Sequence, residues 1–415
     1  MLSHSFLSLF RQKLEMEAEI KTSVNKLSFD NIEVAFDGKS DQDITRAYWL
    51  FRAINSNLLV RVGPQILKLA LALRLPVLGI VKATIFRQFC GGENIKDCMA
   101  TITKLSNFKL GSVLDYSVEG EENEDGFEHT CTEICDTIKR SKGDSAIPFC
   151  VFKMTGIARF GLLEKMSVNS TLTDQEHKEA EKIKSRLLQI CSLAHECKVR
   201  VFIDAEESWI QNAIDIMTDE MMEQFNKGDD TIVFNTIQLY RHDRLQFLKS
   251  SYQKSVEKNY KLGLKLVRGA YMEKERERAS KNGYPSPIQP DQNSTNKDYD
   301  DALAFCMDHL DSIELCAGTH NEKSCYLLAQ LMDAKNISTN DDRIWFSQLL
   351  GMSDHISYNL AYAGYNVAKY VPYGPVTTVL PYLIRRAQEN TSISGQMGRE
   401  LKMILSEKKR RKKTS

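Results

Sequence analysis

Short β-rich runs alternate with longer helical stretches along most of the chain after residue 108. Several of these runs are almost entirely apolar over four residues, as expected for strands that are covered on both faces. The segments between them show a 3.6-residue apolar period, and most are long enough for a crossover helix. The eight runs are Ser112–Tyr116, Pro148–Met154, Val199–Asp204, Thr231–Gln238, Leu262–Gly269, Ile313–Thr319, Arg343–Leu349 and Val367–Pro372.

Eight strand–helix units predict an α/β fold of the TIM-like (β/α)8 barrel type over residues 109–395. A doubly wound open sheet would give a similar alternation, but its first turn usually carries a glycine-rich loop. No GxGxxG follows any of the eight runs, so the barrel is preferred. Residues 1–108 are interpreted as a helical region, and residues 396–415 as a helix end with a basic tail.

The composition removes several functional classes. Lysine and arginine balance aspartate and glutamate at 55 each, so no overall field attracts nucleic acid. The ten cysteines form no CxxC and no zinc-type spacing with histidine, which predicts free thiols in a reducing compartment and no metal site.

Three other segments carry structural expectations. The most apolar stretch, residues 66–81, contains Lys68, Arg74 and Pro76 and therefore cannot span a membrane. Residues 282–298 are rich in Pro and Asn and predict a long loop after the fifth strand. Residues 408–413 (KKRRKK) predict a disordered basic tail, which could contact anionic lipid at about 1 kcal/mol per charge.

Polar side chains recur within or just after the later part of the strands. Because a (β/α)8 barrel carries its active site at that end, these residues are candidates for a site. They are Lys153, Asp204, Gln238, Thr319, His320, Gln348 and Tyr370. The structural alternatives are an Asp204–Lys153 ion pair and a helix cap formed by His320.

A further cluster is expected on the last barrel helix, which Pro375 could open. Tyr382, Arg385, Arg386 and Glu389 follow an i, i+3, i+4, i+7 spacing and so share one helical face. Paired guanidinium groups suit bidentate binding of a carboxylate, whereas the plain alternative is a solvated arginine pair. Spacing alone favours neither interpretation.

Five motifs favour the carboxylate interpretation, because they resemble those of the proline dehydrogenase family and occur in family order. The resemblance extends over residues 90–390 and is strongest to the monofunctional enzymes. The motifs are KLVRGAYMEKER at 265–276, YLIRRAQEN at 382–390, DAEE at 204–207, THN at 319–321 and YVPYG at 370–374.

The resemblance implies a distorted barrel that binds FAD non-covalently and oxidises L-proline to Δ1-pyrroline-5-carboxylate, the first step of proline catabolism to glutamate. A hydride equivalent would pass from proline C5 to flavin N5, and the electrons would pass to a membrane quinone. It also implies a location on the cytoplasmic side of a bacterial inner membrane or in a mitochondrial matrix, with peripheral membrane contact.

The resemblance also implies roles for single residues. The carboxylate would be held by Arg385, Arg386 and Lys153. The ring would be enclosed by Tyr370, Tyr382 and Leu349, with Asp204 and Tyr271 beside them and Glu389 supporting the arginine helix. The flavin positions would be Gln238, Lys265, Val267, Arg268, Gly269, Ala270, Thr319 and His320. Glu93 resembles an acid that pairs with an arginine and gates the site.

Three alternatives stay open at this point. A flavin barrel of the methylenetetrahydrofolate reductase type would not need the paired arginines. A hydroxyproline dehydrogenase of the same family would need space for a ring hydroxyl, so the bulky Tyr370 favours proline. A barrel retained for binding without turnover would not need so complete a set of site residues.

Overall fold

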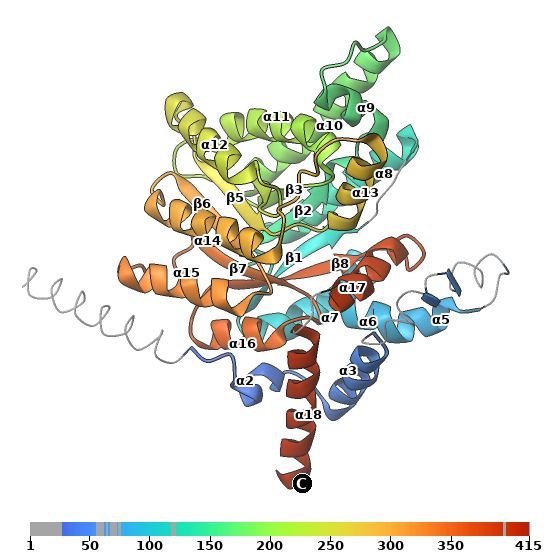
Figure 1. Cartoon of the computed structure of the whole chain (residues 1–415), viewed down its shortest axis with the longest axis vertical. Helices are drawn as coiled ribbons and strands as arrows, with labels where there is room; N and C mark the ends of the chain where they lie inside the picture. The colour runs from blue at the N-terminus through green and yellow to red at the C-terminus, as the bar shows by residue number, and fades with distance from the viewer. Residues whose placement is uncertain are drawn as a thin grey trace, which may run out of the picture.

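The chain is described by a computed structural model over residues 27–54, 62–63, 65–66, 73, 76–117, 122–392 and 396–414. Side chains at 387–397 and 414 lie outside this description. The centre of the molecule is a closed barrel in which each strand pairs in parallel with its neighbours (Figure 1). The strands are β1 (Leu110–Tyr116), β2 (Phe149–Lys153), β3 (Arg200–Asp204), β4 (Val233–Gln238), β5 (Leu262–Val267), β6 (Ile313–Gly318), β7 (Ile344–Leu349) and β8 (Val367–Tyr373).

The predicted barrel is therefore confirmed, and all eight runs contain a strand. Closure is made by β8 and β1, where Tyr370 lies beside Val113. Inside the barrel, the ring of Phe149 stacks on that of Phe202 with centroids 4.4 Å apart, and Phe234 meets both edge-on. This aromatic layer fills the barrel interior below the carboxyl ends of the strands. The carboxyl ends are therefore left for polar side chains.

Helices surround the barrel, as the apolar periodicity predicted (Figure 1). Those that follow the strands are α8 (Glu124–Ser141), α10 (Asp174–Cys197), α11 (Ser208–Phe225), α12 (Arg244–Lys258), α14 (Gln292–Asp308), α15 (Glu322–Ala334), α16 (Asp354–Tyr362) and α17 (Leu380–Ser392). Three short helices lie in loops at the carboxyl end: η2 (Met154–Gly156), α9 (Phe160–Ser167) and α13 (Met272–Asn282).

The described N-terminal part is helical, as expected. Its elements are α2 (Ile32–Phe36), α3 (Asp41–Ile54), α5 (Leu78–Val81), the π-helix η1 (Lys82–Phe86), α6 (Arg87–Phe89) and α7 (Ile95–Ser106). A second apolar cluster joins α3 to the last two helices, with Phe51, Leu383 and Ile404 among its buried members. The boundaries proposed at residues 108 and 395 stay predictions.

Two local expectations about loops and helix starts are wrong. The loop predicted at 282–298 is shorter, because the Asp291 side chain accepts the Ser294 N–H at 2.8 Å and starts α14. Pro375 does not open α17; its carbonyl accepts the N–H groups of Thr378 and Val379 in a preceding turn.

The predicted disorder of the basic tail is also wrong, since residues 408–413 belong to the helix α18 (Gln396–Thr414). Glu407 is fully buried and accepts hydrogen bonds from Arg410 and Arg411. Arg410 also reaches Glu33, and Arg411 reaches Asp41 at 2.8 Å. These acids offset the like charges and attach the tail to α2 and α3.

Candidate active site

The polar layer inside the barrel centres on Asp204 at the end of β3. Lys153 lies beside it in the strand register, and the Nζ of Lys265 donates to its carboxylate. The same Nζ lies 2.6 Å from the hydroxyl of Tyr370 on β8. Lys265 and Tyr370 are buried, so this network crosses the barrel interior above the aromatic layer.

Lys265 is thus fixed by charge and by aromatic contacts. Its Nζ lies 4.6 Å from the ring centre of Tyr370 and 5.3 Å from that of Phe202. Burial raises the pKa of Tyr370 well above its usual value, so this residue is a neutral phenol. The structural alternative for Asp204 holds in part, since Asp204 forms an ion pair with Lys265.

Arg268 connects the loops after β5 and β6. Its guanidinium donates to Asn296 at 2.8 Å, to Thr319 at 2.7 Å and to Ser324 at 2.9 Å. The guanidinium also covers the ring of Tyr299 at 4.3 Å. Asn296 and Ser324 were not predicted from the sequence, because nothing local marks them as partners of a distant arginine.

The turn that follows Arg268 requires a glycine. Gly269 has a φ of 137°, and a Cβ there would lie 2.4 Å from the ring of Tyr240. Gly269 and Ala270 are exposed, whereas Tyr271 is buried. The backbone of the predicted flavin loop is therefore open at the rim and anchored at its end.

Gln238 and Val267 are partners in the β4–β5 register, at the ends of their strands. The side-chain oxygen of Gln238 is buried and has no hydrogen-bond partner among the described residues. An acceptor of this kind fits a polar group such as a cofactor N–H. Gln348, by contrast, bonds the Thr319 carbonyl at 3.0 Å and the hydroxyl of Ser357, so it fixes the β6 end.

His320 does not cap the helix after β6, since Asn321 holds that position and accepts the Ser324 N–H. Instead, Nδ1 of His320 lies 2.9 Å from the hydroxyl of Ser353. Burial lowers the pKa of His320 to about 3, and the charges of Lys369 and Arg386 act in the same direction. The imidazole is therefore neutral and close to positive charge.

The two arginines of α17 lie at the predicted flavin loops. The guanidinium carbon of Arg385 is 5.9 Å from the ring centre of Tyr271. Arg386 is buried and covers the ring of Tyr382 at 5.2 Å. Leu349 pairs with Tyr370 in the β7–β8 register. The side chain of Glu389 lies outside the described residues, so its supporting role stays a prediction.

Glu93 follows a glycine pair that packs against the end of β8. A Cβ on Gly91 would lie 2.4 Å from a methyl carbon of Val371, which explains the small residue. The Glu93 carboxylate forms an ion pair with Lys82, which lowers its pKa. The predicted pairing of Glu93 with an arginine stays a prediction.

Two further carboxylates were missed. Asp115 is the last residue but one of β1, is buried and accepts from the hydroxyl of Ser117 at 2.6 Å, so the strand-end rule could have found it. Glu206 of the DAEE motif accepts from the N–H and the hydroxyl of Thr155 at 3.0 and 2.5 Å. Burial raises the pKa of Glu206 to about 7.

The whole arrangement defines a class of protein. A (β/α)8 barrel with lysine and arginine side chains at its carboxyl end is suited to hold an anionic substrate beside a bound cofactor. All ten cysteines are free, as predicted. Within the described ranges, no helix is long and apolar enough to cross a membrane, and no acid, histidine or cysteine cluster is placed to hold a metal.

The profile of the family described as proline dehydrogenase matches residues 98–399. The chain is 32% identical to mitochondrial proline dehydrogenase 1 of Dictyostelium discoideum, over 93% of this chain and 75% of that protein. It is 30% identical to hydroxyproline dehydrogenase of Xenopus laevis, over 93% of this chain and 90% of that protein. The chain therefore belongs to the proline dehydrogenase family of oxidoreductases, which are in general flavoproteins.

A solved structure supports the fold. The structure of proline utilization A from Bdellovibrio bacteriovorus, inactivated by N-propargylglycine, superimposes with a TM-score of 0.67 over 92% of this chain. The sequence identity is 19%, and the chain covers 42% of that much longer protein, so the likeness concerns the fold alone.

Proposed function

We propose that this protein binds FAD and oxidises L-proline to Δ1-pyrroline-5-carboxylate. The observation that carries the proposal is the position of the paired arginines. Arg385 lies against Tyr271 of the GAY motif, and Arg386 is close enough to His320 to depress its pKa. A carboxylate bound by these arginines would hold its ring beside the predicted flavin positions.

The arginines and Lys153 would orient the substrate. Guanidinium groups bind a carboxylate through two parallel hydrogen bonds, which fixes both position and rotation of the ring. Tyr370, Tyr382 and Leu349 would form walls around the pyrrolidine. The surrounding positive charge disfavours an ammonium, so it would help the amine of proline to lose its proton before reaction.

The residues of the β4–β6 ends fit a flavin. Gln238 offers a buried acceptor, and Lys265 and Arg268 supply positive charge next to an exposed backbone turn. Val267, Gly269, Ala270, Thr319 and His320 complete the proposed set. Bound FAD would supply the two-electron acceptor that no amino-acid side chain provides. A neutral His320 would act as a hydrogen-bonding group there.

Oxidation of 4-hydroxyproline is the second candidate, because a hydroxyproline dehydrogenase is among the relatives. Tyr370 is 7% exposed, and Lys265 holds its hydroxyl at 2.6 Å. This fixed, bulky side chain leaves little room for a ring hydroxyl, and it favours proline.

A spectrum of the purified protein tests the proposal. With FAD, the protein should be yellow, and L-proline under argon should bleach the flavin bands faster than trans-4-hydroxy-L-proline does. A short-chain ubiquinone analogue should restore the colour, as expected if a quinone is the acceptor. Protein that takes up no FAD, or a flavin that L-proline leaves oxidised, would contradict the proposal.

We further propose that α18 contacts an anionic membrane surface, where a lipid quinone would be available. Its buried face contains Met403, Ile404 and Glu407, whereas Lys409 and Lys412 are exposed on the other side. The Nζ of Lys408, the residue before Lys409, lies 4.8 Å from the ring centre of Tyr48. The next residue, Trp49, is 58% exposed, and its ring lies 5.5 Å from the guanidinium carbon of Arg52. An exposed tryptophan beside a basic side chain suits a lipid interface. The matrix side of a mitochondrion and the cytoplasmic side of a bacterial inner membrane both present such a surface.

Vesicle sedimentation tests this contact. The double variant Lys409→Gln/Lys412→Gln should weaken binding to vesicles with 30% anionic lipid by about 2 kcal/mol, or roughly 30-fold. The matched control Lys178→Gln/Lys184→Gln removes two exposed lysines from α10 and should bind like the wild type. Equal binding by both variants would contradict the assignment to α18.

A further inference from the structure

The inner face of α18 reaches two loops that end at the candidate active site. On this helix, Glu400 accepts the backbone N–H of Ser353 at 2.6 Å. The adjacent Arg399 forms an ion pair with Glu322, which also lies 3.0 Å from Nε2 of His355. Ser353 precedes α16 and Glu322 opens α15, so one helix end is joined to both loops.

Both contacts reach residues that lie next to His320, one by a hydrogen bond and one along the chain. The hydroxyl of Ser353 lies 2.9 Å from Nδ1 of His320, and Glu322 follows His320 by two positions in the chain. Glu400 is therefore linked to His320 through a single residue. This link could not be predicted from the sequence, because position 400 falls in the segment interpreted as a helix end with a basic tail.

The backbone of Ser353 makes this link specific. Ser353 is fully buried and has a φ of 50° and a ψ of 41°, a left-handed conformation that a serine adopts only under constraint. Its N–H points to Glu400, and its carbonyl accepts the N–H groups of Ile356 and Ser357. Without the Glu400 carboxylate, a buried donor would lose its acceptor and the turn could relax.

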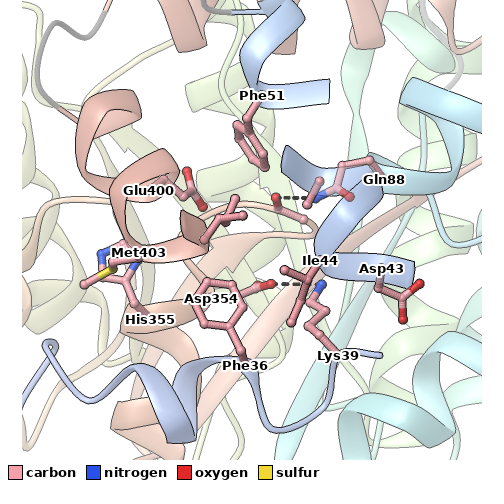
Figure 2. A pocket seen from close by; sticks show the side chains of 13 residues that line it. Phe36, Lys39, Asp43, Ile44, Phe51, Gln88, Asp354, His355, Glu400 and Met403 are labelled. Carbon is pink, nitrogen blue, oxygen red and sulfur yellow. Dashed lines mark hydrogen bonds and ion pairs between the residues drawn. The ribbon is translucent and has the colours of Figure 1, made fainter. Parts of the chain in front are cut away.

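Close packing around Glu400 limits the other positions that its side chain could take (Figure 2). Glu400 and Met403 line a small space together with Asp354 and His355 of α16 and with Lys39, Ile44 and Phe51, and Lys39 is paired with Asp354. The space between them is a cavity of about 20 Å³, which is room for about one water. Asp354 is held between Lys369 at 2.8 Å and Lys39 at 3.0 Å, so this part of the wall is itself fixed.

We propose that Glu400 is a positioning residue of the active site, which fixes the orientation of His320 through Ser353, with Arg399 supporting the neighbouring loop through Glu322. The importance of this role for flavin binding rests on the proposed function. The contacts with Ser353 and Glu322 do not depend on it.

The chain offers a matched control for Glu400. Glu407 is a second buried glutamate on the same helix, and it pairs with Arg410 and Arg411 instead of a site loop. Replacing either glutamate by leucine removes a buried carboxylate from α18. Only the change at position 400 removes the acceptor of Ser353. Glu400→Gln keeps a side-chain oxygen that can accept the same N–H.

The first measurement uses protein without flavin. Histidine-labelled protein is studied by NMR, and His320→Gln identifies the His320 signals. Glu400→Leu and Ser353→Ala should both shift these signals, while Glu407→Leu and Glu400→Gln should leave them near the wild-type positions. Ser353→Ala retains Glu400, so the link can be tested even if Glu400→Leu does not fold.

The second measurement is FAD affinity by fluorescence titration. Loss of a partner for a buried donor should weaken binding by roughly 5- to 150-fold in Glu400→Leu. Glu400→Gln should stay within about threefold of the wild type, since it retains an acceptor. If Glu400→Leu and Glu407→Leu are alike in both measurements, the positioning role is refuted. If the wild type binds no FAD while the His320 signals respond as expected, the proposed function fails and the link through Ser353 stands.

Discussion

The buried pair of Lys265 and Asp204 gives the sharpest test of the site's construction. We consider the substitution Lys265→Met, which keeps an unbranched chain of similar length against Phe202 and Tyr370. The side chain of Lys265 is 5% exposed and that of Asp204 is 17% exposed, so solvent screens the pair weakly. The substitution leaves a carboxylate in the barrel and removes the donor to the Tyr370 hydroxyl.

Breaking a buried ion pair from one side typically costs about 3–5 kcal/mol. Lys153 remains beside Asp204 in the register, so we expect the lower end of this range. A chain of 415 residues has an unfolding entropy of roughly 0.9 kcal/mol/K, so Tm should fall by about 3–4 °C. Asp204→Asn should cost a similar amount, because it leaves the buried ammonium of Lys265 without its anion.

The double variant Lys265→Met/Asp204→Asn separates the pair from general damage. It contains neither stranded charge, so its loss of Tm should be clearly smaller than the sum of the two single losses. Circular dichroism of flavin-free protein avoids the stabilisation that bound ligand would add. As a control, Lys297→Met removes an exposed lysine paired with Asp301 and should change Tm by less than about 1 °C. Additive losses in the cycle would refute the coupling.

Three further outcomes follow from the site. Arg385→Met or Arg386→Met should raise KM for proline about 10- to 100-fold while FAD stays bound. The exposed control Arg276→Met should leave KM unchanged. An unchanged KM in both the Arg385 and the Arg386 variant would refute the carboxylate assignment. Tyr370→Ser should shift kcat/KM toward hydroxyproline; an unchanged ratio of the two substrates would refute that reasoning. Burial raises the pKa of Glu206 to about 7, so the folded state loses stability as pH rises from about 4.5 to 7. Relative to wild type, Glu206→Gln should therefore gain roughly 3 °C in Tm between pH 5 and pH 8, and a constant difference would count against the pKa shift.

The barrel was predictable because burial on both faces leaves a strong local signal. Each strand in the interior of an α/β barrel is covered on both sides, so runs such as Phe149–Lys153 are apolar without alternation. The direction in which a single side chain points was harder to predict from the sequence. Lys369 lies in the middle of β8 and is fully buried, yet it points to Asp354 of α16 and away from the barrel interior.

The site was predictable in its parts and not in its connections. Motifs assigned Asp204 and Tyr370 to the substrate and Lys265 to the flavin, but the structure joins all three in one network. Asp204 is 61 positions and Tyr370 is 105 positions from Lys265 in the sequence, and only closure of the barrel brings the three together. A charge network of this kind depends on register between strands, which hydrophobic patterning does not specify.

The error at the C-terminus came from treating a block of like charge in isolation. Glu407 lies three and four residues before Arg410 and Arg411, the spacing at which helical neighbours offset each other's charge. Together with Met403 and Ile404, it continues one buried stripe that starts at Glu400. When Glu400 and Glu407 are considered together with the basic residues, this segment predicts a helix with one packed face. That face is where Glu400 of α18 meets Ser353, so the segment interpreted as a helix end with a basic tail contains the residue that supports His320.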